Sequence, residues 1–321
     1  MALYVNTNVT SLRGQSSLNK ASNALSTTYN RLSTGLRINS AKDDAAGLQI
    51  SDRLTSQING LNQGNRNAND GIALTQTVEG AMDEMTTMLQ RVRTLSVQAA
   101  NGTNTQSDRD SIQAEVTALS KEITRIASRT TFAGKKVLSA FDDAAASIVQ
   151  TNGKGQVNFQ VGSNANDVLK LDLRLTKANG DMNPDTKDYS LKSLCEAAGV
   201  KDAAKSIADG DKNIGATKGY TVFNVSTSTA AQATLADIDK VINLIDKKRG
   251  DFGALQNRLE STISNQTNIA NNESDARSRI RDTDYASEAS NLSAQSIVQQ
   301  AASSMLTQAN SIPQLALSLL G

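Results

Sequence analysis

A narrow apolar stripe near the N-terminus is the first pattern along the chain. Between Asn6 and about Thr34, apolar residues recur mostly at intervals of three, four and seven, which is the spacing of one helix face. The stripe consists of Val9, Leu12, Leu18, Ala21, Leu25 and Leu32. Asn6, Thr7 and Asn8 are suitable N-caps, and Gly35 is a suitable C-terminal stop. We therefore predict an amphipathic helix here.

A much longer seam follows, from about Ala45 to Ala99. Its residues mostly alternate spacings of three and four, as in a coiled coil. They are Leu54, Ile58, Leu61, Ala68, Ile72, Met82, Met85, Leu89 and Val92. One helix over this range would be roughly 80 Å long. Four glycines in its interior each cost about 1 kcal/mol against Ala, so we expect partners along its length. They are Gly60, Gly64, Gly71 and Gly80.

A third helix and a β-hairpin are predicted next. After the loop NGTNT, the sequence Ser107 to Asp110 resembles a capping box with Asp in the third position. Apolar residues then repeat at four, three, four and three, which predicts a helix: Ile112, Val116, Leu119, Ile123 and Ile126. Two alternating runs then flank GSNAND, and they predict a hairpin of half-buried strands. Their apolar residues are Val157, Phe159 and Val161, then Leu169, Leu171, Leu173 and Leu175.

The pattern weakens between Ala178 and about Thr229 and then becomes helical again. The weak stretch holds one short helix candidate, SLKSLCEAAG, and one strand candidate, YTVFNV. A long seam then runs from near Ala233 to about Arg281, through Ile238, Ile242, Ile245, Phe252, Leu255, Leu259, Ile263, Gln266 and Ile269. A last helix has the stripe Ala294, Val298, Ala301, Met305, Ile312, Ala316 and Leu319. Pro313 should kink or restart it.

The predicted fold is mainly α. Long antiparallel coiled-coil helices pair the N- and C-terminal regions, and they carry a β-hairpin and a small irregular α/β outer insertion. Both ends have stripes too narrow for a buried helix, and the chain has no acidic residue before Asp43 and no charged residue after Glu288. Many copies packed side by side would bury these stripes around an uncharged lining, which predicts a tube. An ordinary coiled coil is the alternative.

Composition limits the chemistry that this chain can perform. It has no His, so the commonest general base and metal ligand are both missing. A passive thiol is the favoured interpretation of the lone Cys195, over a nucleophile. The net charge of +1 gives no overall sign of a nucleic-acid or membrane partner. The first residues lack a signal-peptide pattern, and no apolar run is long enough to span a bilayer. We expect no enzyme, no cofactor and no metal.

Several long motifs, in order, resemble those of bacterial flagellins. They are NRLSTGLRINSAKDDAAGLQISDRL (30–54), LQRVRTLSVQAANGT (89–103), SDRDSIQAEV, SRIRDTDYASE and the C-terminal LLG. The resemblance covers roughly residues 1–176 and 235–321. It implies a structural subunit that self-assembles into the helical filament used for motility. The alternatives are a hook–filament junction protein of low copy number and a soluble coiled-coil adaptor.

The resemblance also implies a domain plan and a set of partners. Residues 1–43 and 283–321 would form an inner terminal coiled-coil domain, 44–176 and 231–282 a rod-like domain with the hairpin, and 177–230 a variable outer insertion. Partners would be further copies of the chain, an export chaperone at Ala286 to Gly321, and the filament cap and hook-junction proteins. The protein would be extracellular, exported without a cleaved signal peptide. Subunit packing is expected at Leu12, Leu25, Leu32, Val298, Met305, Ile312, Leu319 and Leu320.

Two further surfaces follow from the same resemblance. A host innate immune receptor of flagellins would read Gln90, Arg91, Leu95 and Glu115, although Leu95 also suits the apolar seam. The C-terminal leucines resemble a segment that cytosolic sensors read: Leu315, Leu317, Leu319 and Leu320. O-linked sugars have candidate acceptors at Ser226, Thr227, Ser228 and Thr229, for which a plain polar loop is the alternative. Cysteine is unusual in flagellins, so Cys195 is either native or an introduced labelling site.

Overall fold

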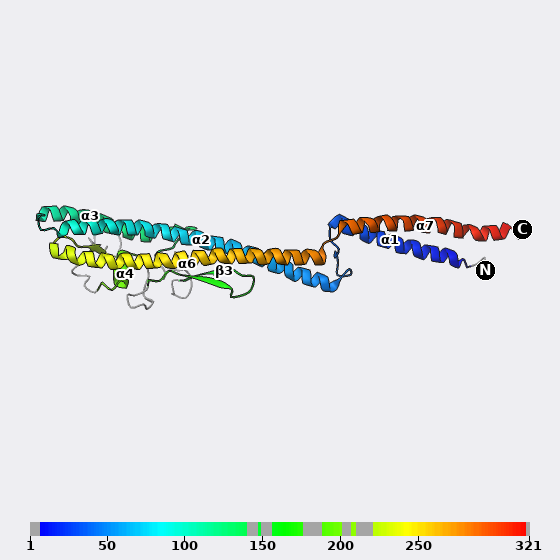
Figure 1. Ribbon diagram of the computed structural model, residues 1–321, viewed down its shortest axis with the longest axis horizontal. Helices are drawn as coiled ribbons and strands as arrows, with labels where there is room; N and C mark the ends of the chain where they lie inside the picture. The colour runs from blue at the N-terminus through cyan, green and yellow to red at the C-terminus, as the bar shows by residue number, and fades with distance from the viewer. Residues whose placement is uncertain are drawn as a thin grey trace. The chain divides into compact units, whose positions relative to one another are not determined.

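Long helices dominate the chain (Figure 1). The computed structural model describes residues 7–139, 147–148, 156–175, 188–200, 207–209 and 221–318. The long helices are α1 (Val9–Thr34), α2 (Ala45–Ala100), α3 (Gln106–Arg129), α6 (Ser228–Arg281) and α7 (Tyr285–Ser318). The chain divides into two compact units, Met1–Asn59 with Asn268–Gly321, and Gly60–Thr267. The predicted mainly α fold is confirmed, whereas the three-part domain plan stays a prediction.

Short elements lie between α3 and α6. Three two-stranded antiparallel sheets pair β1 (Thr131–Phe132) with β2 (Lys135–Lys136), β3 (Gln156–Gln160) with β4 (Val168–Asp172), and β5 (Ile207–Asp209) with β6 (Thr221–Phe223). A short helix, α4 (Leu191–Ala197), lies before β5 in the described part of this region. The β3–β4 pair is the predicted hairpin, with Val157 opposite Leu171 and Phe159 opposite Leu169.

The first unit pairs α1 with α7 in antiparallel fashion. Asn8 caps α1 by accepting the backbone N–H of Ser11 at 3.0 Å, and Gly35 ends the helix in the left-handed conformation with φ of 70°. Both ends of α1 therefore agree with the sequence. Near one end of the pair, Asn8 Nδ2 donates to the Ala309 carbonyl at 2.7 Å, and near the other, Arg31 lies 3.8 Å from Glu288. These contacts fix the direction of the pairing.

The connectors on either side of this pair are held by backbone hydrogen bonds. The N–H of Arg37 donates to the Arg281 carbonyl at 2.7 Å, and the N–H of Thr283 donates to the Gly35 carbonyl at 2.9 Å. Asp43 accepts the backbone N–H of Ser40 at 2.9 Å, and such donors hold the pKa of its carboxyl below the usual value. The connector residues are thus ordered by the chain's own main-chain donors.

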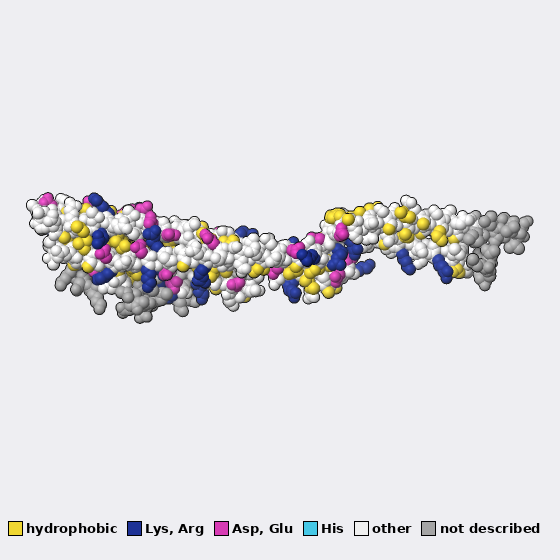
Figure 2. All heavy atoms as spheres, in the orientation of Figure 1, with side chains coloured by type: hydrophobic (Ala, Val, Ile, Leu, Met, Phe, Trp, Pro, Cys, Tyr) yellow, Lys and Arg dark blue, Asp and Glu magenta, His cyan; other side chains and the backbone are white. Residues whose placement is uncertain are grey.

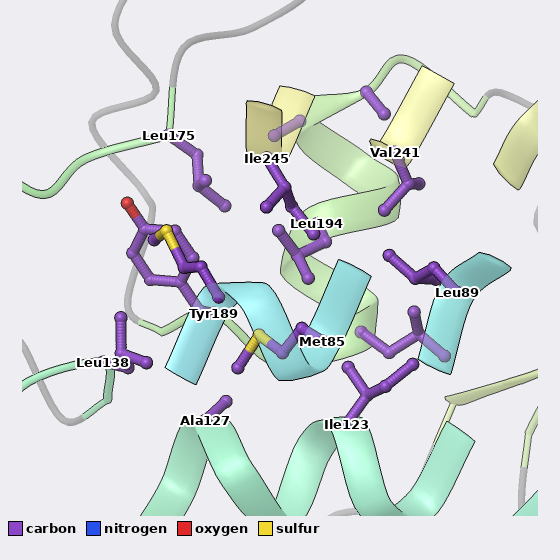
Figure 3. Packing of buried hydrophobic residues seen from close by; sticks show 14 of the residues in the cluster. Met85, Leu89, Ile123, Ala127, Leu138, Leu175, Tyr189, Leu194, Val241 and Ile245 are labelled. Atoms are coloured by element: carbon purple, nitrogen blue, oxygen red, sulfur yellow. The ribbon is translucent and has the colours of Figure 1, made fainter. Parts of the chain in front are cut away.

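The second unit has one continuous hydrophobic core. Met85 and Leu89 from α2, Ile123 from α3, and Val241 and Ile245 from α6 converge on it (Figure 3). The three helical seams predicted from spacing therefore face one another. Burying such side chains stabilises the fold by roughly 1.5–3 kcal/mol each. This burial offsets the helix-propensity cost of the four interior glycines of α2.

Residues from the predicted outer insertion are part of this core. Tyr189 and Leu194 are fully buried in this core (Figure 3). The Tyr189 hydroxyl donates to the Leu173 carbonyl at 2.5 Å. The side-chain amide of Gln113 on α3 binds the end of β6 and the residues after it. It donates to the Phe223 carbonyl at 2.8 Å and accepts the Val225 N–H at 2.6 Å. The described parts of 177–230 are therefore tied to the helices, and most of the remaining residues lie outside the described ranges.

The α2 glycines make room for the hairpin. A Cβ on Gly64 would lie 1.8 Å from the Val161 carbonyl oxygen, and one on Gly60 would lie 2.7 Å from Ser163 Cβ. A Cβ on Gly71 would lie 3.3 Å from atoms of Phe159. Nothing lies within 4 Å of the same point on Gly80. Three of the four glycines therefore allow the hairpin to approach α2 closely.

Four details differ from the sequence-based predictions. The capping box of α3 uses Thr105 as N-cap with Asp108 at N3, two residues before the predicted Ser107. Helix α6 begins at Ser228 rather than near Ala233, because Thr227 already supplies a hydroxyl to the Ala230 N–H at 3.1 Å. Strand β4 ends at Asp172, and α7 continues through Pro313 without a restart.

Two Gly→Ala substitutions on α2 should have opposite effects. Gly64→Ala should destabilise the protein, because the new methyl group collides with the rigid Val161 backbone. Gly80→Ala, the matched control in open space, should stabilise it by about 0.5–1 kcal/mol through helix propensity alone. Urea unfolding of both variants checks this, and a stabilising Gly64→Ala would contradict the close approach.

Candidate interaction surfaces

The contact between α1 and α7 contains several small side chains. The buried residues of α1 are Ser11, Ala21, Leu25 and Thr28, and those of α7 in the described range are Glu288, Ala302 and Ala309. Ser11 Oγ donates to Asn310 Oδ1 at 2.7 Å, so polar groups share the interface. Alanine buries little apolar area, and this seam therefore supplies less stabilisation than the core of the second unit.

Large apolar side chains of the same pair point to solvent. Ile297, Val298 and Met305 on α7 are 66%, 48% and 68% exposed, and Leu12 and Tyr29 on α1 are exposed as well. Figure 2 shows hydrophobic side chains along α7. Helix α7 therefore carries two stripes, an inner one toward α1 that includes Ala302, Leu306 and Ala309, and an outer one of exposed large residues. An outer apolar stripe of this kind is unusual for a free surface and marks an interaction site.

The predicted packing residues are divided between these two faces. Leu12, Val298 and Met305 are exposed, Leu32 is half-buried, and Leu25 lies within the α1–α7 contact. Ile312 belongs to α7, but its side chain is outside the described set. Leu319 and Leu320 lie outside the described residues, so their roles in packing and in sensing stay predictions. The sequence stripe omitted Ile297 and Tyr29, which only the positions of the helices reveal as exposed.

The two helices also differ in charge. Arg13 and Lys20 are exposed on α1 and lie two turns apart, whereas α7 has no charged residue after Glu288. Figure 2 shows Lys and Arg side chains along α1 and none along the described part of α7 beyond its first turn. The outer stripe of α7 can therefore enter an apolar contact without desolvating a charge, which would be costly.

The predicted receptor residues only partly share a surface. Gln90, Arg91 and Glu115 are exposed, and Arg91 Nε donates to Glu115 Oε1 at 2.9 Å. Leu95 is 2% exposed and belongs to the core, as its position in the seam predicted. The α2–α3 packing thus brings Arg91 and Glu115 together on the surface and encloses Leu95 in the core.

The hydroxyls of 226–229 differ in access. Ser226 Oγ donates to Asn224 Oδ1 at 2.7 Å, and Ser228 Oγ donates to the Ala100 carbonyl at 2.9 Å. Both serines are half-buried, whereas Thr227 and Thr229 are exposed. The threonines are therefore the more accessible acceptors.

Buried titratable groups do not gather into a reactive site in the described chain. Burial raises the pKa of the Cys195 thiol, which is 3% exposed, so it stays protonated and inaccessible to labels. Burial lowers the pKa of the Lys248 ammonium, while Asp172 and Asp251 act in the opposite direction. Among the described residues, no three carboxylates or thiols form a cation site, and no helix has an apolar stretch that would span a membrane.

Comparison with known proteins gives the chain a family. Residues 5–143 match the model of the bacterial flagellin N-terminal helical region, and 235–320 match that of the C-terminal helical region. Polar flagellin F of Vibrio parahaemolyticus is 40% identical and flagellin D of Vibrio anguillarum 39% identical, each alignment covering 100% of both chains.

A solved structure supports the fold alone. A putative flagellar hook-associated protein from Vibrio parahaemolyticus matches 75% of this chain and 100% of its own with a TM-score of 0.53 and 14% identity. At that identity the likeness concerns architecture and does not bear on function. The two family models and the full-length identities decide the assignment: the chain belongs to the bacterial flagellin family, whose members are structural and non-catalytic subunits of the flagellar filament.

Proposed function

We propose that this flagellin builds its filament by packing the outward faces of α1 and α7 against other copies of the chain. The observation that carries the proposal is the exposed stripe of Ile297, Val298 and Met305, which α1 does not cover. Burying each of these side chains between subunits would contribute roughly 1.5–3 kcal/mol, more than an alanine contact within the pair. Assembly, rather than folding of the single chain, would then supply most of the stability of this unit.

An uncharged α7 suits a tubular assembly. Its polar residues are Ser, Thr, Asn and Gln, so a face turned toward a water-filled channel stays hydrated without attracting charged chains. The basic residues Arg13 and Lys20 stand on the other helix. This difference supports α7 as the helix of the pair that lines the channel.

Other partners follow from the same exposed stripe and from the family. Before assembly, an export chaperone would cover Ala286 to Gly321 and so keep the outer stripe of α7 from premature contact. The filament cap and the hook-junction proteins would meet the same terminal faces at the two ends of the filament. The protein would act outside the cell, exported without a cleaved signal peptide, to form the propeller that the motor turns.

Recognition by a host immune receptor is a second candidate role, favoured by the exposed Arg91–Glu115 pair. The receptor would contact Gln90, Arg91 and Glu115, and Leu95 would support the helix from below. The C-terminal leucines would be read separately by cytosolic sensors. For O-linked sugars, the exposed Thr227 and Thr229 are better acceptors than the half-buried serines beside them.

Removing the outer stripe should weaken polymerisation without unfolding the protein. We expect Val298→Ser with Met305→Gln to raise the critical concentration at least about tenfold, because two buried side chains are lost from each contact. Gln300→Ser with Gln308→Ser, also exposed on α7, is the matched control. Sedimentation and negative-stain electron microscopy measure the outcome. Filaments at an unchanged critical concentration would reject the interface, and short oligomers from the native chain would favour a junction protein.

The terminal pair should exchange amide hydrogens faster than the second core in the free subunit. Ordering a residue costs about 1–2 kcal/mol of backbone entropy, and the Ala-rich seam offsets less of it than Met85 and Leu89 do on α2. Hydrogen–deuterium exchange with mass spectrometry compares α1 and α7 with residues 78–95, before and after assembly. If α1 and α7 were as well protected as residues 78–95 in the monomer, the proposal that assembly stabilises the terminal pair would be wrong.

Two substitutions separate stability from recognition at the receptor surface. Leu95→Ala should cost about 2–5 kcal/mol of unfolding free energy because it leaves a cavity in the core. Glu115→Ala should cost less than about 1 kcal/mol, since its ion pair with Arg91 is exposed, yet it should weaken receptor binding. Denaturant unfolding and a binding assay on the same samples give both values. A stable Leu95→Ala protein that loses binding would place Leu95 at the contact.

A further inference from the structure

The tip of the β3–β4 hairpin packs on α2 and α6 beyond the C-terminal end of α3. Helix α3 runs antiparallel to α2, with Glu115 bonded to Arg91. It ends at Arg129, and counting back along α2 places that end near about residue 77. From Gly60 to Gly71 the described element that packs on α2 beside α6 is the hairpin.

Amide side chains from both helices hold two successive carbonyls of this tip. Asn67 Nδ2 on α2 donates to the Gln160 carbonyl at 2.8 Å, and Gln266 Nε2 on α6 donates to the Val161 carbonyl at 2.6 Å. Gly64 allows the approach, since any side chain there would overlap the Val161 oxygen. The two donors therefore reach adjacent peptide groups from different helices.

Gln266 occupies a seam position that an apolar residue would otherwise fill. It is 5% exposed and follows Leu255, Leu259 and Ile263 at intervals of three and four. Its nitrogen must face Val161, because a carbonyl oxygen can only accept, and its own Oε1 is left buried without a partner among the described residues. A buried unpaired acceptor costs stability. The hydrogen bond from Gln266 to the hairpin offsets part of the cost of burying this polar side chain.

We propose that Asn67 and Gln266 form a two-sided clip that fastens the hairpin tip to α2 and α6 together and so supplies the third layer of the bundle beyond α3. The two bonds act on neighbouring carbonyls of one rigid turn, in which the N–H groups of Val161 and Gly162 both donate to the Asp167 carbonyl. Losing either bond therefore frees the same backbone. Gln266 and Asn67 are positioning residues for the hairpin and do not belong to the exposed stripe of α7.

Amide exchange in a double-mutant cycle tests the clip. Gln266→Met, close in size to Gln, and Asn67→Ala are each expected to speed exchange of the Val161 and Gly162 amides roughly tenfold in the monomer. The double variant should be little faster than either single one, because the tip is already free. Amides of α2 from 78 to 95 should keep their native protection, which separates release of the tip from general unfolding.

The matched control is Gln256→Met, a half-buried glutamine of α6 whose Nε2 donates to Glu79 Oε2 at 2.9 Å instead of to the hairpin. It should leave exchange at the tip unchanged. Multiplicative effects of the two single variants would overturn the two-sided clip, as would native protection of Val161 in Gln266→Met. Loss of protection throughout the unit would also overturn it. The readout uses the free subunit and is thus independent of polymerisation.

Discussion

The antiparallel return of the chain on itself is the constraint on which the other features depend. A long isolated helix with interior glycines is marginal in water, so α2 is stable only when its seam is covered. Helix α6 covers one side of that seam and α3 another, and Met85, Leu89, Val241 and Ile245 meet as a result (Figure 3). Within the second unit, the described hairpin, β6 and α4 are positioned by their contacts with these helices.

The second unit and the α1–α7 pair bury different amounts of large apolar side chain, and this difference separates folding from assembly. The second unit encloses Leu, Ile, Val, Met and aromatic residues within one chain. The pair of α1 and α7 buries Leu25 and Glu288 together with Ala, Ser and Thr residues, and it leaves Ile297, Val298 and Met305 exposed. A helix pair that leaves large apolar residues exposed gains stabilisation from further contacts. That balance suits a filament subunit.

Side-chain amides and hydroxyls repeatedly bind irregular segments to the helices. Gln113 binds the backbone at the end of β6, and the Tyr189 hydroxyl donates to the Leu173 carbonyl. Gln266 and Asn67 bind the tip of the β3–β4 hairpin. Buried carbonyl groups need donors, and in this chain neutral side chains supply them without burying a charge. This explains why Gln266 occurs in a seam that is otherwise apolar.

The sequence by itself determined the local elements. The three-and-four spacing predicted every long helix, alternation predicted the hairpin, and Asn8 and Gly35 marked the ends of α1, because these signals depend on residues close in the chain. The flagellin motifs, likewise contiguous, identified the family.

Only the tertiary structure decided which stripe of α7 faces inward, since two stripes share one helix and only the position of α1 chooses between them. It likewise showed that Leu95 lies in the core, whereas Arg91 and Glu115 are paired on the surface. From the sequence, the glycines of α2 were expected only to lower helix stability. The fold shows that three of them allow close packing of a hairpin that lies nearly a hundred residues later in the chain. Contacts between distant segments depend on how whole helices pack, which local spacing does not encode.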